Sequence, residues 1–139
     1  MIVVIDTNVF ISAAGSRAGL SWRSFVLLAQ RHFQLAVTKE ILAEYERTAE
    51  RLAREPGKFQ GMKWRPLFHW VNDQAVYFEP SPLGKQRSRD AGDDIFLACA
   101  LASGAKVIVS HDKDLLELEK PFGIEILKPT TFVARMKVI

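Results

Sequence analysis

Short apolar runs and longer stretches of helical spacing follow one another along the chain. Residues 2–5, 106–109 and 124–127 are rich in β-branched side chains, which predicts strands buried on both faces of a sheet. Weaker strand patterns cover residues 33–37 and 75–78. The pattern therefore predicts about five strands with other structure between them.

Helical spacing fills the intervals between these runs. It is clearest over residues 38–54, where apolar side chains recur on one face behind Thr38, a residue able to cap the helix start. Residues 93–103 are apolar nearly all round, which predicts a helix packed in the interior and ended by Gly104. Further helices are predicted at residues 8–14, 20–31, 66–73, 114–118 and 130–136.

The alternation of strands and helices predicts an α/β fold with a parallel sheet covered on both faces. No repeat, low-complexity tract or Ser/Gly-rich linker divides the sequence, so we expect one domain over residues 1–139. Residues 80–92 contain two Pro, two Gly and several basic side chains, a composition typical of an exposed loop.

Composition narrows the functional classes. With 48% hydrophobic and 25% charged residues, the chain is typical of a globular protein. The net charge of +3 favours a polyanionic partner without proving one. Cys99 lies in an apolar run and is expected in the core. No signal peptide and no membrane-spanning segment is visible, so we expect a cytoplasmic protein without a membrane role.

Acidic residues follow several of the predicted strands. Asp6 comes directly after the first strand, and Asp112 follows the strand at 106–109 by three positions. Asp93 and Asp94 open the apolar helix, while Glu44 lies in the second turn of the helix at 38–54. Because open parallel sheets bind ligands at the carboxyl ends of their strands, four separate segments can bring acids to one place.

Carboxylates gathered in this way need a cation, since like charges at short distance disfavour ionisation. All-oxygen ligands favour Mg²⁺ or Mn²⁺, and the scattered positions of His32, His69 and His111 do not form a zinc motif. Asp at a helix start is also a common cap, so each acid taken alone fits a structural role as well.

Five blocks of sequence, in order, resemble the motifs of PIN-domain nucleases. They are VIDTNV at 4–9, TKEILAEY at 38–45, DDIFLA at 93–98, VSHDKDLL at 109–116 and KPTTF at 128–132. The resemblance spans essentially the whole chain at the length of one domain. It implies a PIN-like three-layer α/β/α sandwich with a central parallel sheet of about five strands.

The resemblance also implies a metal-dependent endoribonuclease that uses Mg²⁺ or Mn²⁺ to hydrolyse RNA. Carried over residue by residue, it assigns the catalytic, metal-holding role to four acids. Asp94 is chosen among the acids of the third block because it directly precedes the apolar run. The metal-site acids are Asp6, Glu44, Asp94 and Asp112, and the supporting residues are Asn8, Ser110, Thr7 and Asp93. His111 either contacts substrate or fills a turn.

Positive charge must surround an acidic centre that binds RNA. The candidates are Arg47, Arg51 and Arg54 on one helical face, with Arg87 and Arg89 in the basic loop. The helical stripe fits equally well a solvated face paired with neighbouring glutamates. Likeness to VapC-type toxins further implies the toxin half of a type II toxin-antitoxin pair, with a protein antitoxin as partner and a homodimeric assembly.

Two other functions remain open at this level. A receiver-type phosphoacceptor also places acids at strand ends around Mg²⁺, but it should carry paired acids in the first loop, where this chain has Asp6 alone. A non-catalytic RNA- or protein-binding module of the same fold is the second alternative. Metal-dependent cleavage of RNA would distinguish a nuclease from both.

Overall fold

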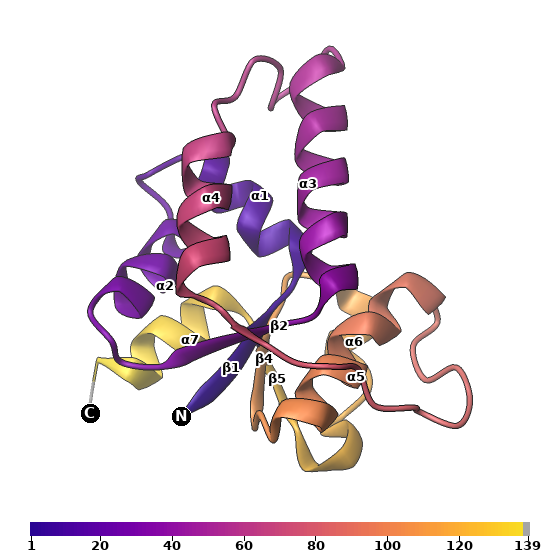
Figure 1. Ribbon diagram of the computed structural model, residues 1–139. Helices are drawn as coiled ribbons and strands as arrows, with labels where there is room; N and C mark the ends of the chain where they lie inside the picture. Colours follow the sequence, from indigo (N-terminus) through magenta and orange to yellow (C-terminus); the bar gives the residue numbers. More distant parts are fainter. Residues whose placement is uncertain (138–139) are drawn as a thin grey trace.

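The computed structural model describes residues 1–137 and contains a single five-stranded sheet within that range (Figure 1). The strands lie in the order β3-β2-β1-β4-β5, and every neighbouring pair is parallel. The predicted α/β class and parallel sheet are therefore confirmed. The strands are β1 (Ile2–Ile5), β2 (Gln34–Val37), β3 (Val76–Tyr77), β4 (Val107–Val109) and β5 (Glu125–Leu127).

The predicted helices are all present, with ends displaced by at most two residues. The helix predicted over 20–31 stops two residues early, at Ala29, because Arg31 adopts a left-handed backbone with φ of 64°. Two short 3-10 turns, η1 (Ala91–Asp93) and η2 (Pro121–Gly123), were not predicted. The helices are α1 (Thr7–Gly15), α2 (Leu20–Ala29), α3 (Lys39–Arg54), α4 (Arg65–Gln74), α5 (Asp94–Ser103), α6 (Lys113–Leu116) and α7 (Pro129–Met136).

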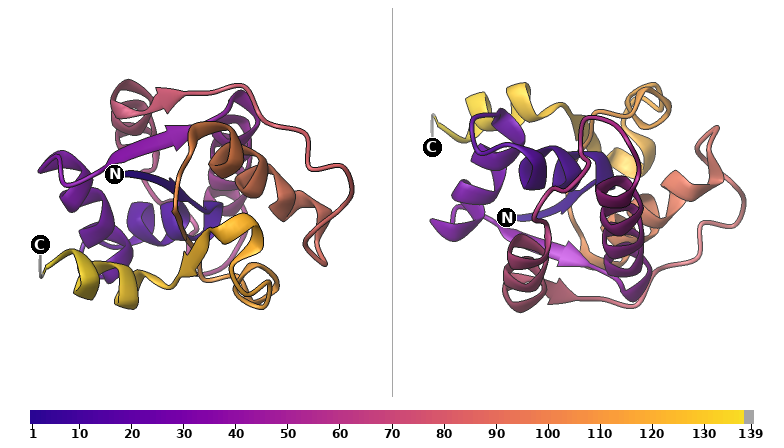
Figure 2. Two further views of the ribbon diagram at one scale, coloured as in Figure 1. Left: turned by 90° about the horizontal axis from the view of Figure 1, so that it is seen from below. Right: turned by 90° about the horizontal axis from the view of Figure 1, so that it is seen from above.

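Helices cover both faces of the sheet. The chain moves outward from β1 to β2 and β3, and then crosses back to β4 on the other side of β1. Because crossovers between parallel strands are right-handed, this reversal places α5 on the face opposite α1 to α4. The helix α5 contacts β1, β2 and β4, while α7 packs on α2, and Figure 2 shows α5 and α7 on different sides of the sheet. The result is the three-layer arrangement that the sequence predicted.

A buried aromatic pair fixes α1 and α3 on the central strand. The rings of Phe10 and Tyr45 stack with centroids 4.6 Å apart, and the Tyr45 hydroxyl donates to the main-chain carbonyl of Ile5. Burial raises the pKa of Tyr45 well above its usual range, so the hydroxyl keeps its proton. Cys99 is fully buried on α5, as expected. The last residue of β1 is thereby held firmly beside both helices.

The register of the sheet decides which residues meet at its carboxyl edge. Ile5 is paired with Val109, and Val109 with Leu127. Asp6 follows Ile5 at the end of β1, and Ser110 follows Val109 at the end of β4. These two residues therefore lie side by side. Among residues 1–137, the helices are all too short or too polar to cross a membrane.

Candidate metal centre

Asp6 occupies the middle of the carboxyl edge of the sheet. It is 3% exposed, and its backbone N–H donates to the carbonyl of Val109 at 2.9 Å, continuing the ladder between β1 and β4. The residue also marks the N-terminus of α1, but its side chain makes no capping hydrogen bond there. The common structural role of an Asp before a helix therefore does not explain this carboxylate.

Ser110 joins Asp6 to Asp112. The Ser110 hydroxyl donates to Asp6 Oδ2 at 2.6 Å and accepts from the backbone N–H of Asp112 at 2.9 Å. Ser110 is fully buried, so neither contact is exchanged easily with water. Ser110, which was predicted as a supporting residue, therefore holds Asp6 and Asp112 in a fixed relation.

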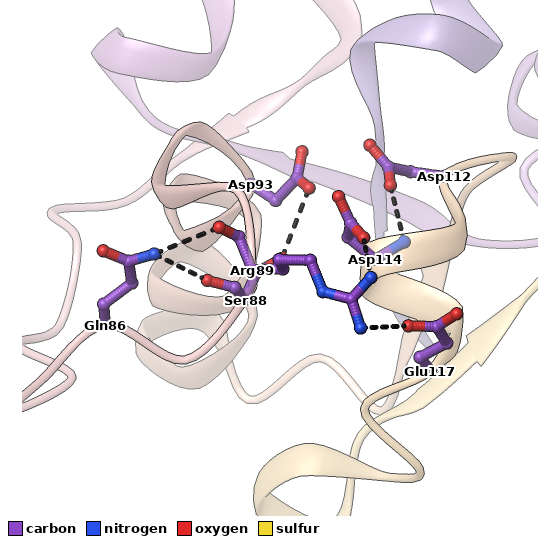
Figure 3. Close-up of polar contacts among 7 residues, drawn as sticks. All are labelled: Gln86, Ser88, Arg89, Asp93, Asp112, Asp114 and Glu117. Carbon is purple, nitrogen blue, oxygen red and sulfur yellow. Dashed lines mark hydrogen bonds and ion pairs between the residues drawn. The ribbon is translucent and has the colours of Figure 1, made fainter.

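Three further carboxylates gather next to Asp6. Asp93, Asp112 and Asp114 each offer an oxygen, and these atoms lie within 4.8 Å of one another (Figure 3). One oxygen of Asp112 caps α6 by accepting from the Asp114 N–H at 2.8 Å, which leaves the other oxygen for a different partner. Asp112 thus caps α6 and still has one carboxylate oxygen available to a ligand.

The geometry favours Asp93 over the predicted Asp94 as the member of the acid cluster. Both oxygens of Asp94 accept backbone N–H groups, from Arg87 at 2.8 Å and from Ser88 at 2.7 Å. Asp94 therefore anchors the loop at residues 80–92. Asp93, expected only as a supporting residue, is the one that faces Asp112 across the site.

Glu44 reaches the site from α3. Its carboxylate accepts a hydrogen bond from the Thr7 hydroxyl, and its charge acts on Asp6. Thr38 caps α3 by accepting from the Ile41 N–H at 3.2 Å, which fixes the start of the helix that carries Glu44. Thr7, which was predicted as a supporting residue, therefore orients the carboxylate of Glu44.

The surroundings of Asp6 oppose its ionisation. Burial is the largest cause and raises the pKa of Asp6 to about 6, with the charges of Asp112 and Glu44 acting in the same direction. The hydrogen bond from Ser110 lowers the pKa and offsets part of that increase. Within residues 1–137, no basic side chain forms an ion pair with Asp6, so a bound cation would offset its charge.

Asp93 shows the same behaviour more strongly. Burial raises the pKa of Asp93 to about 7, and the charges of Asp112, Asp6 and Asp90 add to the increase. Asp93 is 7% exposed and accepts from the Ser88 hydroxyl at 3.3 Å. Ser88 is itself buried, although most residues of the loop at 80–92 are exposed, as predicted.

Among residues 1–137, Arg89 is the basic residue that forms an ion pair with a member of the acid cluster. Its guanidinium lies 3.9 Å from Asp114 and 3.3 Å from Glu117 (Figure 3). The side chain is 77% exposed, so these ion pairs are weak and are easily exchanged. Arg89 is therefore free to leave Asp114 for a phosphate.

Arg87, predicted with Arg89 as an RNA contact, is turned inward by the loop. Its guanidinium donates to the carbonyl of Leu83 at 2.9 and 3.2 Å and lies 5.0 Å from the centroid of the Phe122 ring. These contacts give Arg87 a role in closing the loop.

The arginines of α3 divide into two kinds. Arg51 pairs with Glu55 and Arg54 with Glu50, both along the helix. Arg47 is exposed and forms no ion pair within residues 1–137. The solvated-face interpretation thus fits Arg51 and Arg54, and the charge of Arg47 is available to a partner.

Asn8 and His111 stand beside the centre. Asn8 is exposed in the first turn of α1, and His111 Nε2 lies 3.2 Å from Ser21 Oγ. Burial and the charge of Lys128 lower the pKa of His111, which favours its neutral form. Asp114 also belongs to the cluster and was not predicted from the sequence, although its position two residues after Asp112 was the available signal.

The fold and the site together define the class. Carboxylates from β1, η1, α3 and the β4–α6 connection meet at the carboxyl edge of a parallel sheet in an α/β/α sandwich, an arrangement suited to a divalent cation. A family model described as PIN domain matches residues 2–114. The chain belongs to the PIN-domain family, and nuclease-type chemistry with a divalent metal follows as its general class.

Solved structures agree with this fold. The chain is similar to PAE2754 from Pyrobaculum aerophilum, with a TM-score of 0.68, 18% identity, and coverage of 100% of this chain and 91% of that one. No curated protein matches the sequence. The strand order β3-β2-β1-β4-β5 also differs from the 2-1-3-4-5 order of receiver-type folds, which argues against the phosphoacceptor alternative.

Proposed function

We propose that this protein is a Mg²⁺- or Mn²⁺-dependent endoribonuclease. The observation that carries the proposal is the meeting of Asp93, Asp112 and Asp114 within 4.8 Å, next to an Asp6 that Ser110 ties to Asp112. Most of these carboxylates have no basic partner, and their mutual repulsion is unfavourable unless a cation offsets it. They are the ligands that a hard divalent cation prefers.

The donor set fits Mg²⁺ or Mn²⁺ and does not fit zinc. The residues that would hold the ion are Asp6, Asp93 and Asp112, with Asp114 and Glu44 at the edges of the centre. All offer carboxylate oxygen, and the nearest imidazole, His111, is bonded to Ser21. When bound, such a cation supplies a Lewis acid for a phosphate oxygen and for the attacking water.

The chain's own residues supply the positioning. Ser110 sets the orientation of Asp6, and Thr7 directs Glu44 toward the same space. We assign to Glu44 the role of orienting the attacking water, because it is half-buried on a separate helix and faces Asp6 from α3. Arg89 would bind a substrate phosphate by exchanging Asp114 for it.

RNA is proposed as the substrate on the strength of the family resemblance and of the basic net charge of +3. The exposed guanidinium groups of Arg47 and Arg89 support a polyanion that approaches along α3 and α6. Such contacts position the backbone and carry no sequence information.

The test is cleavage of a mixed RNA pool by the purified chain with Mg²⁺, with Mn²⁺ or with EDTA. We expect cleavage with either ion, none with EDTA, and none from Asp6→Asn or Asp112→Asn. Asp73→Asn serves as the matched control, because Asp73 is an exposed acid on α4 away from the centre. Single-stranded DNA of the same base composition is run in parallel to test the choice of RNA.

Absence of cleavage under every metal, from protein shown to be folded, would overturn the nuclease proposal. Tight metal-independent binding of RNA in that case would favour the non-catalytic module instead. Cleavage that survives Asp6→Asn would show that the activity belongs to a contaminant or to another site.

We further propose that the protein is the toxin of a toxin-antitoxin pair, inhibited by a protein antitoxin and active as a homodimer. Support comes from the resemblance to VapC-type toxins and from the PIN-domain family of the chain. Induced expression in bacteria should arrest growth with the wild-type chain and not with Asp6→Asn. Light scattering should give about twice the chain mass of 15.7 kDa. Normal growth with a soluble, cleaving protein would argue against the toxin role.

A further inference from the structure

A surface hollow of about 370 Å³ lies beside the carboxylate centre. Its walls come from α1, from the end of α3, from the connection between α3 and α4, and from the segment before α6. The lining residues are Asn8, Ile11, Ser12, Leu52, Phe59 and His111. The volume falls within the range of small-molecule sites, about 300 to 1,000 Å³.

Two of the lining residues are chain neighbours of the acids. Asn8 follows Asp6 by two positions, and His111 lies between Ser110 and Asp112. On the third wall, Leu52 and Glu44 are on the same helix, with Leu52 about 12 Å further along its axis. The hollow therefore opens next to the place where a substrate phosphate would bind and extends away from it along α3.

The hollow combines an apolar floor with a polar rim. Ile11 is 2% exposed, and Leu52 and Phe59 are half-buried, so the floor is already largely shielded from water. Asn8 and His111 are exposed residues at the rim, and His111 Nε2 is hydrogen-bonded to Ser21. An amide and an imidazole can each donate or accept a hydrogen bond.

The Phe59 ring is held in the wall by a close approach to α1. A Cβ atom built on Gly15 would lie 2.7 Å from Phe59 Cε1 and 2.9 Å from Cδ1. The ring thus occupies space that only glycine leaves free at position 15. On the other side, His111 Nε2 lies 3.2 Å from Ser21 Oγ, which restrains the imidazole.

We infer that this hollow binds a nucleobase of the substrate, next to the phosphate that the acid centre takes. A base offers a flat apolar face for the half-buried Phe59 and Leu52, and hydrogen-bonding edges for Asn8 and His111. Unstacked RNA bases are commonly recognised by this combination of an aromatic ring with polar side chains. The inference rests on the proposed function in one respect, namely that a substrate phosphate binds at the acid centre.

A nucleobase fits better than an apolar side chain of a protein partner. The rim carries the amide of Asn8 and the imidazole of His111, whose Nε2 is bonded to Ser21, and a purely apolar guest would offer no partner to the Asn8 amide or to His111 Nδ1. In addition, Asn8 and His111 lie within two residues of Asp6 and Asp112, so a base in the hollow is within reach of a phosphate at the acids.

The test uses the isotopically labelled full chain with Mg²⁺ and, as probes, the four nucleoside 5′-monophosphates and ribose 5-phosphate. We expect at least one nucleotide to shift the amide resonances of Asn8, Ser12 and Phe59 and to bind about tenfold more tightly than ribose 5-phosphate. Equal affinity for all probes, shifts that avoid these residues, or no nucleotide binding would each overturn the inference.

Two variants keep the test independent of folding. Phe59→Leu removes the ring and retains apolar bulk, while Gly15→Ala displaces the ring and removes no lining group. Both should abolish the preference for nucleotides and leave ribose 5-phosphate binding unchanged. The control Tyr77→Leu replaces an exposed aromatic residue on the edge strand β3 and should change neither. A preference that persists in both test variants would overturn the inference.

The outcomes separate this inference from the proposed nuclease. Base-dependent binding in a chain that cleaves nothing would retain the base site and reject the nuclease. Metal-dependent cleavage with equal probe binding would retain the nuclease and reject the base site.

Discussion

The Ser110 hydroxyl donates to Asp6 Oδ2 at 2.6 Å although the two residues are 104 positions apart in the chain. The contact follows from the register of β1 against β4, in which Ile5 is paired with Val109. Since Ser110 also accepts from the Asp112 N–H, one hydroxyl orients two members of the acid centre.

Ser110→Ala should therefore weaken metal binding. Without the hydroxyl, the pKa of Asp6 rises further, and Asp112 loses the contact that fixes its backbone. We expect Mg²⁺ affinity, measured by calorimetry, to fall roughly 10- to 100-fold. Ser110→Thr is the matched control, because it retains the hydroxyl. Equal affinities in the wild type and Ser110→Ala would contradict this role.

Asp93→Asn and Asp94→Asn should have different effects. Asp93 faces Asp112, so its amide variant should lose most cleavage and most Mn²⁺ binding. Asp94 accepts from the N–H groups of Arg87 and Ser88, so its variant should mainly speed hydrogen exchange at those two amides. Cleavage lost only in Asp94→Asn would restore the assignment made from the sequence.

The stability of the metal-free protein should fall as the pH rises from 5 to 8. The folded state raises the pKa of Asp6 from 3.8 to about 6 and that of Asp93 from 3.8 to about 7. The folded chain therefore binds these protons more tightly than the unfolded chain. The resulting stability is complete below pH 3.8 and is lost as the pH passes through 6 and 7. For Asp6 the difference corresponds to about 3 kcal/mol.

Thermal unfolding in EDTA across this pH range measures the effect. Asp6→Asn should flatten the dependence, and saturating Mg²⁺ should stabilise the protein more at pH 8 than at pH 5. The lowered pKa of His111 acts in the opposite direction, so the same series in His111→Gln isolates the acids. A melting temperature that rises with pH in EDTA in that background would refute the assignment.

Arg47→Gln should weaken RNA binding, while Arg54→Gln should have little effect. Arg47 forms no ion pair within residues 1–137, whereas Arg54 is paired with Glu50. A lost phosphate contact lowers the slope of binding against salt concentration by about one. Fluorescence anisotropy with labelled RNA over a salt series checks both variants, and equal slopes would place the RNA elsewhere.

Much of the fold could be predicted because its elements are encoded locally. The buried strand β1 is a β-branched run, and α3 has an apolar stripe behind the Thr38 cap. The two 3-10 turns could not be predicted, because their residues lack a periodic pattern and depend on contacts such as that of Arg87 with Phe122. The resemblance to the PIN-domain family was also visible in five short blocks of sequence.

The site was predicted less completely, and the pair Asp93 and Asp94 shows why. Both precede the same apolar helix, and a sequence gives no measure of which way each side chain turns. The difference arises from the loop at 80–92, whose N–H groups at Arg87 and Ser88 bind Asp94 and leave Asp93 directed at the cluster.

The sequence by itself determined the order of strands and helices, the α/β class and the presence of acids at strand ends. These features depend on side-chain periodicity and on residues close in the chain. Only the tertiary structure decided that Asp93 and Asp114 join Asp112, that Ser110 links Asp112 to Asp6, and that Phe59 lines a hollow over Gly15. Those relations depend on strand register and on packing between distant segments, which local sequence patterns do not specify.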